Sequence, residues 1–265
     1  MKKVNKSLPP NELTDFQKEN AAADWSDFRD AKRSAAYKAL RSLIISDQGG
    51  LCAYCEQNIS TRPSSSRRLE HFHSKSDTSQ PGVNWALEWS NVIAVCLGGS
   101  SSIDDDHTRH PMPTNLSCDA FKAHLENCGK ISKANEGNVL NPQEIPAFPN
   151  LFTFDKATGE LKTDYKVCGS VEFQGQNVHA SLSELVDKTI EVFNLNCQRL
   201  CDERLVMLVH YSQQVARARK ANNKNIFDQL AARWFSQSWP SFFTTRRALL
   251  GKYAESYLIS MNYEG

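Results

Sequence analysis

The residues best suited to chemistry lie between Leu51 and Gly129, a stretch that holds five of the seven histidines and five of the eight cysteines. Within it, two residues separate Cys52 from Cys55. A tight turn at this spacing can direct both thiolates at one tetrahedral zinc ion. A redox pair of the same spacing is expected in a thioredoxin-like βαβ setting, which the flanking sequence does not predict. The pair therefore predicts half of a structural zinc site.

A tetrahedral zinc site needs two more ligands. Cys96 and Cys118 are the preferred candidates, because each borders a short predicted element. Three other residues are alternatives for the fourth position: Cys128, His107 and His110. The cysteines outside the site are interpreted as small buried hydrophobic side chains: Cys128, Cys168, Cys197 and Cys201.

The cellular compartment also favours metal ligation. Residues 1–16 are basic but are not followed by the apolar run of a secretory signal. No window holds the roughly 18 uninterrupted apolar residues of a membrane span. We therefore expect a cytoplasmic protein that makes no use of a membrane. Thiols in a reducing cytoplasm seldom form disulfides, so metal binding or reactivity explains them better.

A second set of polar residues follows the cysteine pair. Glu70 and His71 are adjacent at a predicted strand end, Asn91 lies in a predicted extended run over residues 85–93, and Asp119 opens a predicted helix. Adjacent residues of a regular strand point to opposite faces. A twist or bulge is therefore needed if Glu70 and His71 are to serve one site.

The order C-x-x-C, E-H-F, W-S-N, C and C-D-x-x-K resembles that of HNH nucleases of the ββα-metal type. Within that superfamily the chain is similar to the PtuB family, the nuclease subunits of Septu and retron-associated anti-phage systems. The likeness extends to LRSLIISDQGGLCAYCE, LNPQEIPAFPNLFTFDKATGEL and VFNLNCQRLCDERL, and covers roughly residues 1–210. Two features depart from the general pattern. Residues 97–117 separate the second cysteine pair, and Asp119 stands where Asn or His is usual.

The resemblance implies a role for each polar residue. It implies that His71 is the general base and that Asn91 steadies the loop bearing this histidine. It also implies that Glu70 and Asp119 bind a catalytic divalent ion. Asn115 and His124, nearby in sequence, are the alternatives to Asp119. The zinc ligands that it implies are Cys52, Cys55, Cys96 and Cys118.

These residue types suit hydrolysis of a phosphodiester. A neutral imidazole, with an ordinary pKa of about 6.5, can accept the proton of a water molecule near neutral pH. Carboxylates suit hard Mg²⁺ or Mn²⁺, which can neutralise charge on the departing oxygen. Lys75 is expected to hold a flanking phosphate, and His73 is interpreted as a strand residue or a substrate contact. Trp85 and Trp89 are interpreted as core residues rather than base-stacking platforms.

The remaining elements predict an α+β protein that is mostly helical and has a small β-hairpin insertion. The resemblance implies that a zinc-stabilised ββα-metal core is embedded in it. Apolar periodicity predicts one helix over residues 12–47, ended by Gly49 and Gly50. Residues 61–68 and 98–113 have loop compositions. A hairpin is predicted within residues 140–180, and helices over 181–260. The expected divisions are a helical segment (1–50), the nuclease core (51–130) and a hairpin with helices (131–265).

The chain has a net charge of +1, which indicates no partner, but the charge is unevenly distributed. Between Arg199 and Lys252 there are 10 Lys and Arg against 3 Asp and Glu, a local net charge of +7. One interpretation is a docking or nucleic-acid surface that uses these charges together with neighbouring aromatic residues. The alternative is that the aromatic residues close a helical core: Trp234, Phe235, Trp239, Phe242 and Phe243.

The sequence thus favours a metal-dependent HNH endonuclease with structural zinc and catalytic Mg²⁺ or Mn²⁺. The resemblance implies that it is the effector of an anti-phage system and acts with an ABC-type, PtuA-like ATPase. It also implies a possible association with a retron reverse transcriptase and its RNA and DNA. The alternative is a zinc-stapled module that binds nucleic acid or protein without cleaving it. A module that only binds does not need the carboxylates or His71, and their presence favours the enzyme.

Overall fold

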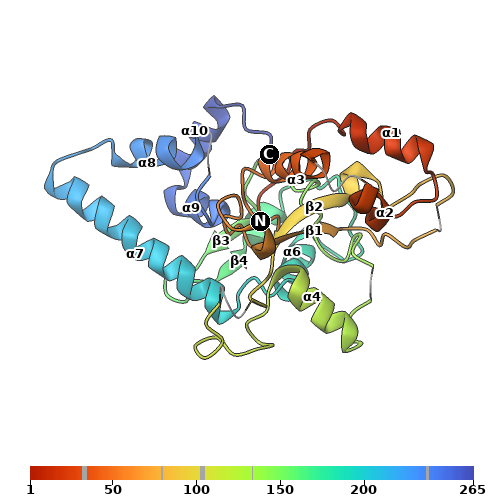
Figure 1. Cartoon of the computed structure of the whole chain (residues 1–265). Coiled ribbons are helices and arrows are strands. Elements are labelled where there is room, and N and C mark those ends of the chain that lie inside the picture. The colour runs from red at the N-terminus through yellow and green to blue at the C-terminus, as the bar shows by residue number, and fades with distance from the viewer. Residues whose placement is uncertain (32–34, 79, 102–104, 133, 237–238) are drawn as a thin grey trace.

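The computed structural model describes residues 1–31, 35–78, 80–101, 105–132, 134–236 and 239–265, and Figure 1 shows the arrangement of its elements. Two small antiparallel sheets form, β1 with β2 and β3 with β4. Helices surround both sheets, so the α+β class predicted from the sequence is confirmed. The helices are α1 (Asn11–Glu19), α2 (Trp25–Ala31), α3 (Ala35–Asp47), α4 (Cys118–Asn127), α5 (Tyr165–Cys168), α6 (Leu182–Val192), α7 (Gln198–Lys220), α8 (Ile226–Phe235), α9 (Phe243–Leu250) and α10 (Lys252–Ser260).

The N-terminal segment folds as α1, α2 and α3, so the prediction of one helix over residues 12–47 is wrong. Asn20 ends α1, where its side-chain amide donates to the carbonyl of Phe16 at 3.0 Å. Asp24 then accepts from the backbone N–H groups of Ser26 and Asp27 at the start of α2. These side-chain bonds compete with a continuous helix, although the apolar period runs on. Residues 32–34 of the predicted helix lie outside the described residues.

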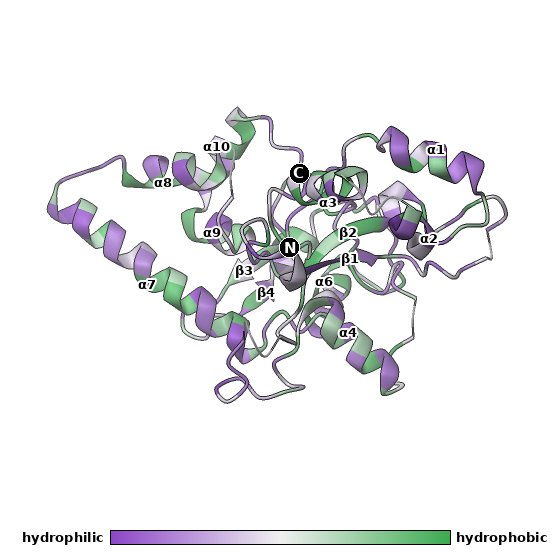
Figure 2. Cartoon of the chain, in the orientation of Figure 1, coloured by the Kyte–Doolittle hydropathy of each residue, from purple (hydrophilic) through white to green (hydrophobic). Residues whose placement is uncertain are grey.

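The first sheet lies at the centre of the molecule. β1 (Arg67–His71) pairs with β2 (Val92–Cys96) in a register that places Glu70 opposite Ile93 and His71 opposite Val92. Every residue of β2 is buried, and Figure 2 shows this strand as hydrophobic. α3 and α4 both contact β2 and lie on either side of the pair in Figure 1. The sheet therefore supports both the cysteines and the polar residues for which the sequence predicts chemistry.

The segment before β2 differs from its prediction. Trp89–Asn91 forms a short 3₁₀ turn, η2, and the strand begins only at Val92. The carboxylate of Glu88 accepts from the backbone N–H and the hydroxyl of Ser90, which stabilises the turn. Trp89 is buried as predicted, and its indole N–H donates to the carbonyl of Ser7 at 2.7 Å.

The second sheet is the hairpin predicted from the sequence. β3 (Phe152–Phe154) pairs with β4 (Leu161–Thr163) around the turn at residues 155–160. β3 contacts α9 and β4 contacts α6, so the hairpin packs against two of the helices that follow it in the chain. A further short 3₁₀ turn, η1 (Ser64–Ser66), precedes β1 within the predicted 61–68 loop. The 98–113 stretch has no helix or strand among its described residues, and residues 102–104 lie outside them.

Two hydrophobic cores hold the chain together. The larger core includes residues from all three sequence segments, among them Phe28, Tyr54 and Phe193. The smaller core lies among the C-terminal helices and includes Trp234 and Phe243. Phe235 and Phe242 are also buried, so these aromatic residues close helical cores and are not available as docking anchors.

Among the described residues, no helix is both long and apolar enough to cross a bilayer.

Candidate active site and metal centre

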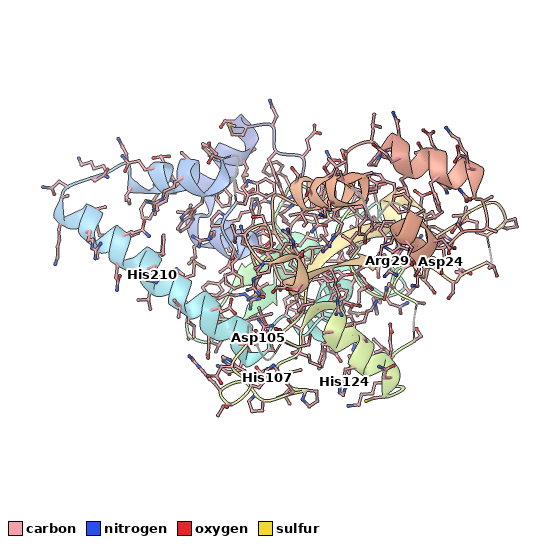
Figure 3. The ribbon with its side chains drawn as sticks, viewed as in Figure 1. Asp24, Arg29, Asp105, His107, His124 and His210 are labelled. Atoms are coloured by element: carbon pink, nitrogen blue, oxygen red, sulfur yellow. The ribbon has the colours of Figure 1, made fainter. Side chains whose placement is uncertain are left out.

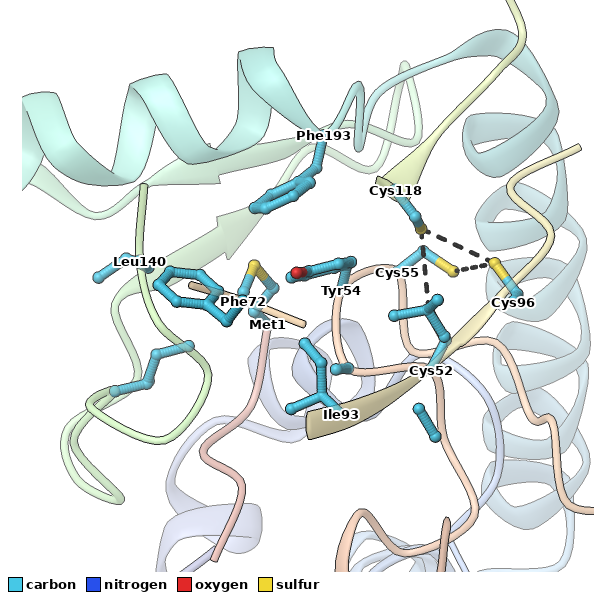
Figure 4. Close-up of a cluster of buried hydrophobic side chains, with 14 of the residues drawn as sticks. Met1, Cys52, Tyr54, Cys55, Phe72, Ile93, Cys96, Cys118, Leu140 and Phe193 are labelled. Carbon is cyan, nitrogen blue, oxygen red and sulfur yellow. Dashed lines mark hydrogen bonds between the residues drawn. The ribbon is translucent and has the colours of Figure 1, made fainter. Parts of the chain in front are cut away.

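Four cysteine thiols converge at one end of the first sheet: Cys52, Cys55, Cys96 and Cys118. All four are buried, and their sulfur atoms lie within 4.8 Å of one another. The closest pairs are Cys55–Cys96 at 3.6 Å and Cys52–Cys118 and Cys96–Cys118 at 3.8 Å (Figure 4). Zinc–sulfur bonds of about 2.3 Å give a tetrahedron with edges of ~3.8 Å. The spacing therefore fits zinc and is far too long for disulfides.

The turn at residues 52–57 presents the first two thiols. Cys52 N–H donates to the carbonyl of Gln57, and Glu56 N–H donates to the carbonyl of Cys52, which closes the turn. Glu56 has a left-handed φ of 62° that makes this tight reversal possible. Ala53 N–H donates to the carbonyl of Ala94 and so docks the turn on β2. β2 then delivers Cys96 at its end.

The fourth thiol is brought in by a close approach of two backbone segments. Gly98 follows β2, has a φ of +63°, and donates its N–H to the Cys96 sulfur at 3.3 Å. A Cβ at this position would lie 2.1 Å from the carbonyl oxygen of Ser117. Only glycine therefore allows the backbone after β2 to lie this close to Ser117, the residue that precedes Cys118.

Arg199 provides a positive charge beside the thiols. This residue lies in the first turn of α7, its side chain is 5% exposed, and it donates to the hydroxyl of Ser117 at 2.9 Å. Burial acts to lower the pKa of its guanidinium, but the neighbouring cysteines Cys197, Cys55 and Cys96 raise this pKa above its ordinary value. Four thiolates cannot be buried together without cations. A zinc ion with Arg199 nearby would satisfy that requirement.

The alternatives for the fourth position lie elsewhere. His107 hydrogen-bonds to the carbonyl of Gly99, and His110 pairs with Asp202 at 3.1 Å. Cys128 is exposed just after α4, so its prediction as a buried residue is wrong. The same prediction is confirmed for Cys168, Cys197 and Cys201. Figure 3 shows His107 in a loop near the start of α7 and His124 on α4.

The two predicted metal-binding carboxylates approach each other between β1 and α4. Lys122, on the next turn of α4 from Asp119, places its amine 3.1 Å from Glu70 and 3.8 Å from Asp119. Arg68 reaches Asp119 from β1 at 2.7 Å. Burial and the charge of Asp119 raise the pKa of Glu70 to about 7, against the lowering effect of Lys122. The carboxylates are thus close enough to share a cation, and side-chain cations already accompany them.

Arg68 and Lys122 were not assigned to the site from sequence. The signal for Arg68 is its two-residue spacing from Glu70, which puts both side chains on one face of a strand. The signal for Lys122 is its three-residue spacing from Asp119, which makes the two neighbours on a helix surface. Asn115 does not join the carboxylates, because its side chain bonds the carbonyl of Pro111 and the backbone N–H of Arg199.

His71 lies apart from the carboxylates. β1 remains regular through its last residue, so Glu70 and His71 point to opposite faces of the sheet and no bulge intervenes. The ring of His71 contacts Trp25 edge-on at 5.3 Å between centroids, and Nε2 lies 3.0 Å from the carbonyl oxygen of Ala86. Because a carbonyl only accepts, Nε2 carries the proton and Nδ1 is free to accept one. Burial lowers the pKa of this histidine.

Asn91 closes the loop that follows His71. Its side-chain oxygen accepts from the backbone N–H of His73 at 2.6 Å, and its amide donates to the carbonyls of His73 and Trp85 at 3.0 and 2.8 Å. One buried residue at the start of β2 therefore fixes the chain just beyond the end of β1. This is the local arrangement needed to hold the His71 backbone in one position.

The other predicted contact residues differ in how open they are. Both ring nitrogens of His73 are engaged, Nδ1 by Glu136 at 2.5 Å and Nε2 by Asp77 at 2.7 Å. Its ring stacks on Trp85 with 3.9 Å between centroids. Lys75, two residues on, is exposed. In the part of the chain that the structure describes, the thiol cluster alone gathers three or more potential ligand atoms this closely.

Comparison with known proteins identifies the kind of enzyme. No protein-family model matches the chain. The chain is 39% identical over 251 residues to an Escherichia coli protein named "Retron Ec83 putative HNH endonuclease". The match covers 94% of this chain and 93% of that protein, which favours a nuclease over a non-catalytic binding module. By this similarity along nearly its whole length, the chain belongs to the HNH endonucleases.

Proposed function

We propose that this HNH endonuclease is a metal-dependent enzyme whose ββα-metal core is formed by β1, β2 and α4. In this proposal Glu70 and Asp119 hold a catalytic Mg²⁺ or Mn²⁺ ion, and four cysteines hold a structural zinc ion. The observation that carries it is the convergence of half-buried Glu70 from β1 and buried Asp119 from α4 beside the thiol cluster. Oxygen ligands of this kind suit hard divalent cations, whereas thiolates suit zinc.

His71, which lies on the other face of β1 from Glu70, is the proposed general base, and this role requires the scissile phosphate to lie across the end of β1. With its proton on Nε2, the ring presents Nδ1 to accept a proton from the attacking water. The lowered pKa keeps the imidazole neutral, and so able to act as a base, at a lower pH than an exposed histidine. Asn91 preserves this alignment through the loop, and Lys75 supplies an exposed positive charge for a flanking phosphate. A bound divalent ion would neutralise charge on the scissile phosphate and the leaving oxygen.

Two variants test the catalytic assignment. His71→Ala should lower the cleavage rate about 10²–10⁴-fold, the usual contribution of a general base. Asp119→Asn should lose Mg²⁺- or Mn²⁺-dependent cleavage while retaining zinc, because the thiol cluster does not use its carboxylate. Cleavage of DNA and RNA substrates is measured with each metal, and elemental analysis gives the zinc content. Wild-type rates in His71→Ala would exclude the base assignment.

We further propose that the enzyme serves in anti-phage defence together with an ABC-type ATPase and a retron. The support is the retron named in its Escherichia coli relative, together with the resemblance to the PtuB family. Nucleolytic activity in a cell needs an external control, which a partner subunit can provide. Co-expression with a PtuA-like ABC-type ATPase should yield a stable complex on size-exclusion chromatography. Separate elution of the two proteins would refute the partnership and leave the nuclease assignment unaffected.

The test of docking must avoid buried residues. Arg247 has a side chain that is 5% exposed and pairs with Glu255 at 2.6 Å, so reversing its charge would disturb the fold. Arg246 is packed against Trp234. These two arginines therefore cannot serve as simple surface probes, and exposed residues of α7 are the better choice.

A further inference from the structure

A cationic cavity lies between α7, α8 and the segment that leads into α9. Its volume is about 670 Å³, and its lining includes Arg217, Arg233, Arg246 and His210. Among the described residues, no carboxylate lines it. Figure 3 shows His210 part-way along α7, the long helix that extends away from the central sheet. None of the residues assigned above to catalysis or to zinc binding contributes to this cavity.

Arg246 is held rigidly at the cavity wall. Its Nε donates to the carbonyl of Ser241 at 2.8 Å, and its guanidinium lies 4.5 Å from the centroid of the Trp234 ring. Burial, reinforced by the charge of Arg233, lowers its pKa to about 10, so it is still protonated at neutral pH. A fixed guanidinium without a carboxylate partner is suited to a phosphate, which it can bind through two hydrogen bonds.

The other two arginines are open to an incoming ligand. Arg217 and Arg233 are exposed, and within the described residues neither forms an ion pair that would neutralise it. Arg233 does donate to the side-chain oxygen of Gln214, across from α8 on α7. Three positive charges that converge without neutralisation repel one another. Such an arrangement is stabilised when an anion with several charges binds.

The cavity offers contacts to phosphates rather than to bases. Trp239 could stack a base only with a free ring face, but Lys2 lies over this ring at 4.5 Å and Phe243 packs against it at 5.0 Å. Trp234 is buried beneath Arg246. Contacts to the phosphate backbone position a nucleic acid without reading its sequence.

We propose that the cavity of Arg217, Arg233 and Arg246 binds backbone phosphates of the nucleic-acid substrate, at a distance along the strand from the bond that is cut. This inference rests on the proposed nuclease function, since it extends the substrate-binding surface of that enzyme. Three of the basic residues between Arg199 and Lys252, those that line the cavity, are thereby assigned to substrate retention. An acidic protein partner is the other ligand of similar charge, and the experiment below separates the two.

The test uses the full-length protein without added Mg²⁺ or Mn²⁺, so that binding is measured without cleavage. Arg217→Gln/Arg233→Gln removes two charges from the cavity. Arg219→Gln/Lys224→Gln removes two exposed charges nearby that do not line it, and is the matched control. Fluorescence anisotropy with short DNA duplexes and single strands gives Kd over a range of salt concentrations. A plot of log affinity against log salt concentration for duplex DNA has a slope of about −0.9 for each phosphate that the protein contacts. The cavity variant loses two such contacts, so the magnitude of its slope should be smaller by about 2.

The slope of the control variant should fall by less than half as much as that of the cavity variant. If both double variants weaken nucleic-acid binding equally, the proposed phosphate site in the cavity is wrong, and the positive charge of the whole surface binds the nucleic acid instead. Unchanged nucleic-acid binding together with loss of the ATPase complex would overturn the phosphate site in favour of protein docking. Cleavage of a long and a very short substrate is measured in parallel, and only the long one should show a raised KM. Absence of any cleavage by the wild type would count against the proposed active site. The binding measurements would still decide whether the cavity binds phosphates, because they do not depend on cleavage.

Discussion

The thiol cluster and the carboxylate pair are built from the same small set of elements, yet they differ in the side chains that surround them. Cys118 and Asp119 are neighbours at the start of α4, and one belongs to each site. The thiols contact one another directly, whereas Lys122 and Arg68 lie against the carboxylates. A neutral thiol packs as a small hydrophobic group, but a buried carboxylate requires a cation.

This difference indicates two kinds of metal dependence. The thiol cluster has the geometry of a closed structural site, and zinc binding there would contribute to folding itself. The carboxylate pair has its own side-chain cations and is therefore compatible with an ion that enters and leaves during turnover. We expect the zinc to be tightly held and the catalytic ion to be exchangeable.

The largest effect should follow from breaking the thiol cluster. Cys52→Ser removes one of four ligands, and structural zinc in small modules contributes roughly 10–16 kcal/mol of apparent binding free energy. Because native proteins are stable by only about 5–15 kcal/mol, we expect an insoluble or unfolded protein that lacks zinc. Cys128→Ser, at an exposed position outside the cluster, is the control and should retain zinc and stability. Unchanged zinc content in Cys52→Ser would remove this residue from the site.

The next effect should follow from removing the cation of the carboxylate pair. Lys122→Met leaves Glu70 and Asp119 buried without their shared amine, and breaking such a pair costs about 3–5 kcal/mol. The loss should be largest without added divalent ion, and Mn²⁺ should raise the Tm of the variant more than that of the wild type. Differential scanning calorimetry measures both, with exposed Lys130→Met as the control. Equal Mn²⁺ shifts in variant and wild type would indicate that the ion binds elsewhere.

A smaller effect is expected from the loop that follows His71. Asn91→Ala removes three hydrogen bonds and leaves buried backbone groups unpaired, at a cost of about 1–3 kcal/mol. A displacement of the loop by about 1 Å would lower the cleavage rate about 10²-fold. Denaturant titration and single-turnover cleavage measure the two effects, and the same substitution at exposed Asn127, Asn127→Ala, is the control. Full activity in Asn91→Ala would show that the loop is held by other contacts.

The sequence predicted the thiol cluster because it depends on spacing and on element boundaries. Cys96 and Cys118 were preferred for bordering short elements, and they do so at the end of β2 and the start of α4. Cys128 is instead interpreted as buried from the usual burial of free cysteine, but α4 ends one residue earlier and leaves this thiol in solvent. A short helix has no sequence signal strong enough to fix its last turn.

Other features depend on tertiary contacts that composition does not encode. The C-terminal aromatic residues have the same helical period whether they face a partner or a core, and packing between α8, α9 and α10 decided for the core. The sequence predicted that Glu70 and His71 need a bulge to serve one site, and the strand has none. The roles of Arg68 and Lys122 emerge only once β1 and α4 lie side by side.

The smallest effect should come from Lys6, which ties the N-terminal segment to the turn before β2. Its amine donates to the carbonyls of Trp89 and Val92, each at 2.5 Å, and burial lowers its pKa to about 7. Between pH 7 and the ordinary lysine pKa of about 10.4, the unfolded chain therefore binds one more proton than the folded chain. Stability contributed by this group rises with pH across that window, by at most about 1.4 kcal/mol per pH unit.

Lys6→Met removes this titration but keeps an apolar side chain over Trp89. The wild type should therefore gain stability relative to the variant between pH 7 and pH 8, with the difference measured by urea unfolding at both values. Exposed Lys18→Met is the control, and its difference from wild type should not change with pH. Lys2, whose pKa burial also lowers to about 7, is present in all three proteins and cancels from the comparison. A pH-independent difference for Lys6→Met would mean that Lys6 remains charged in the fold, and that the turn before β2 is held by a cation instead of a neutral amine.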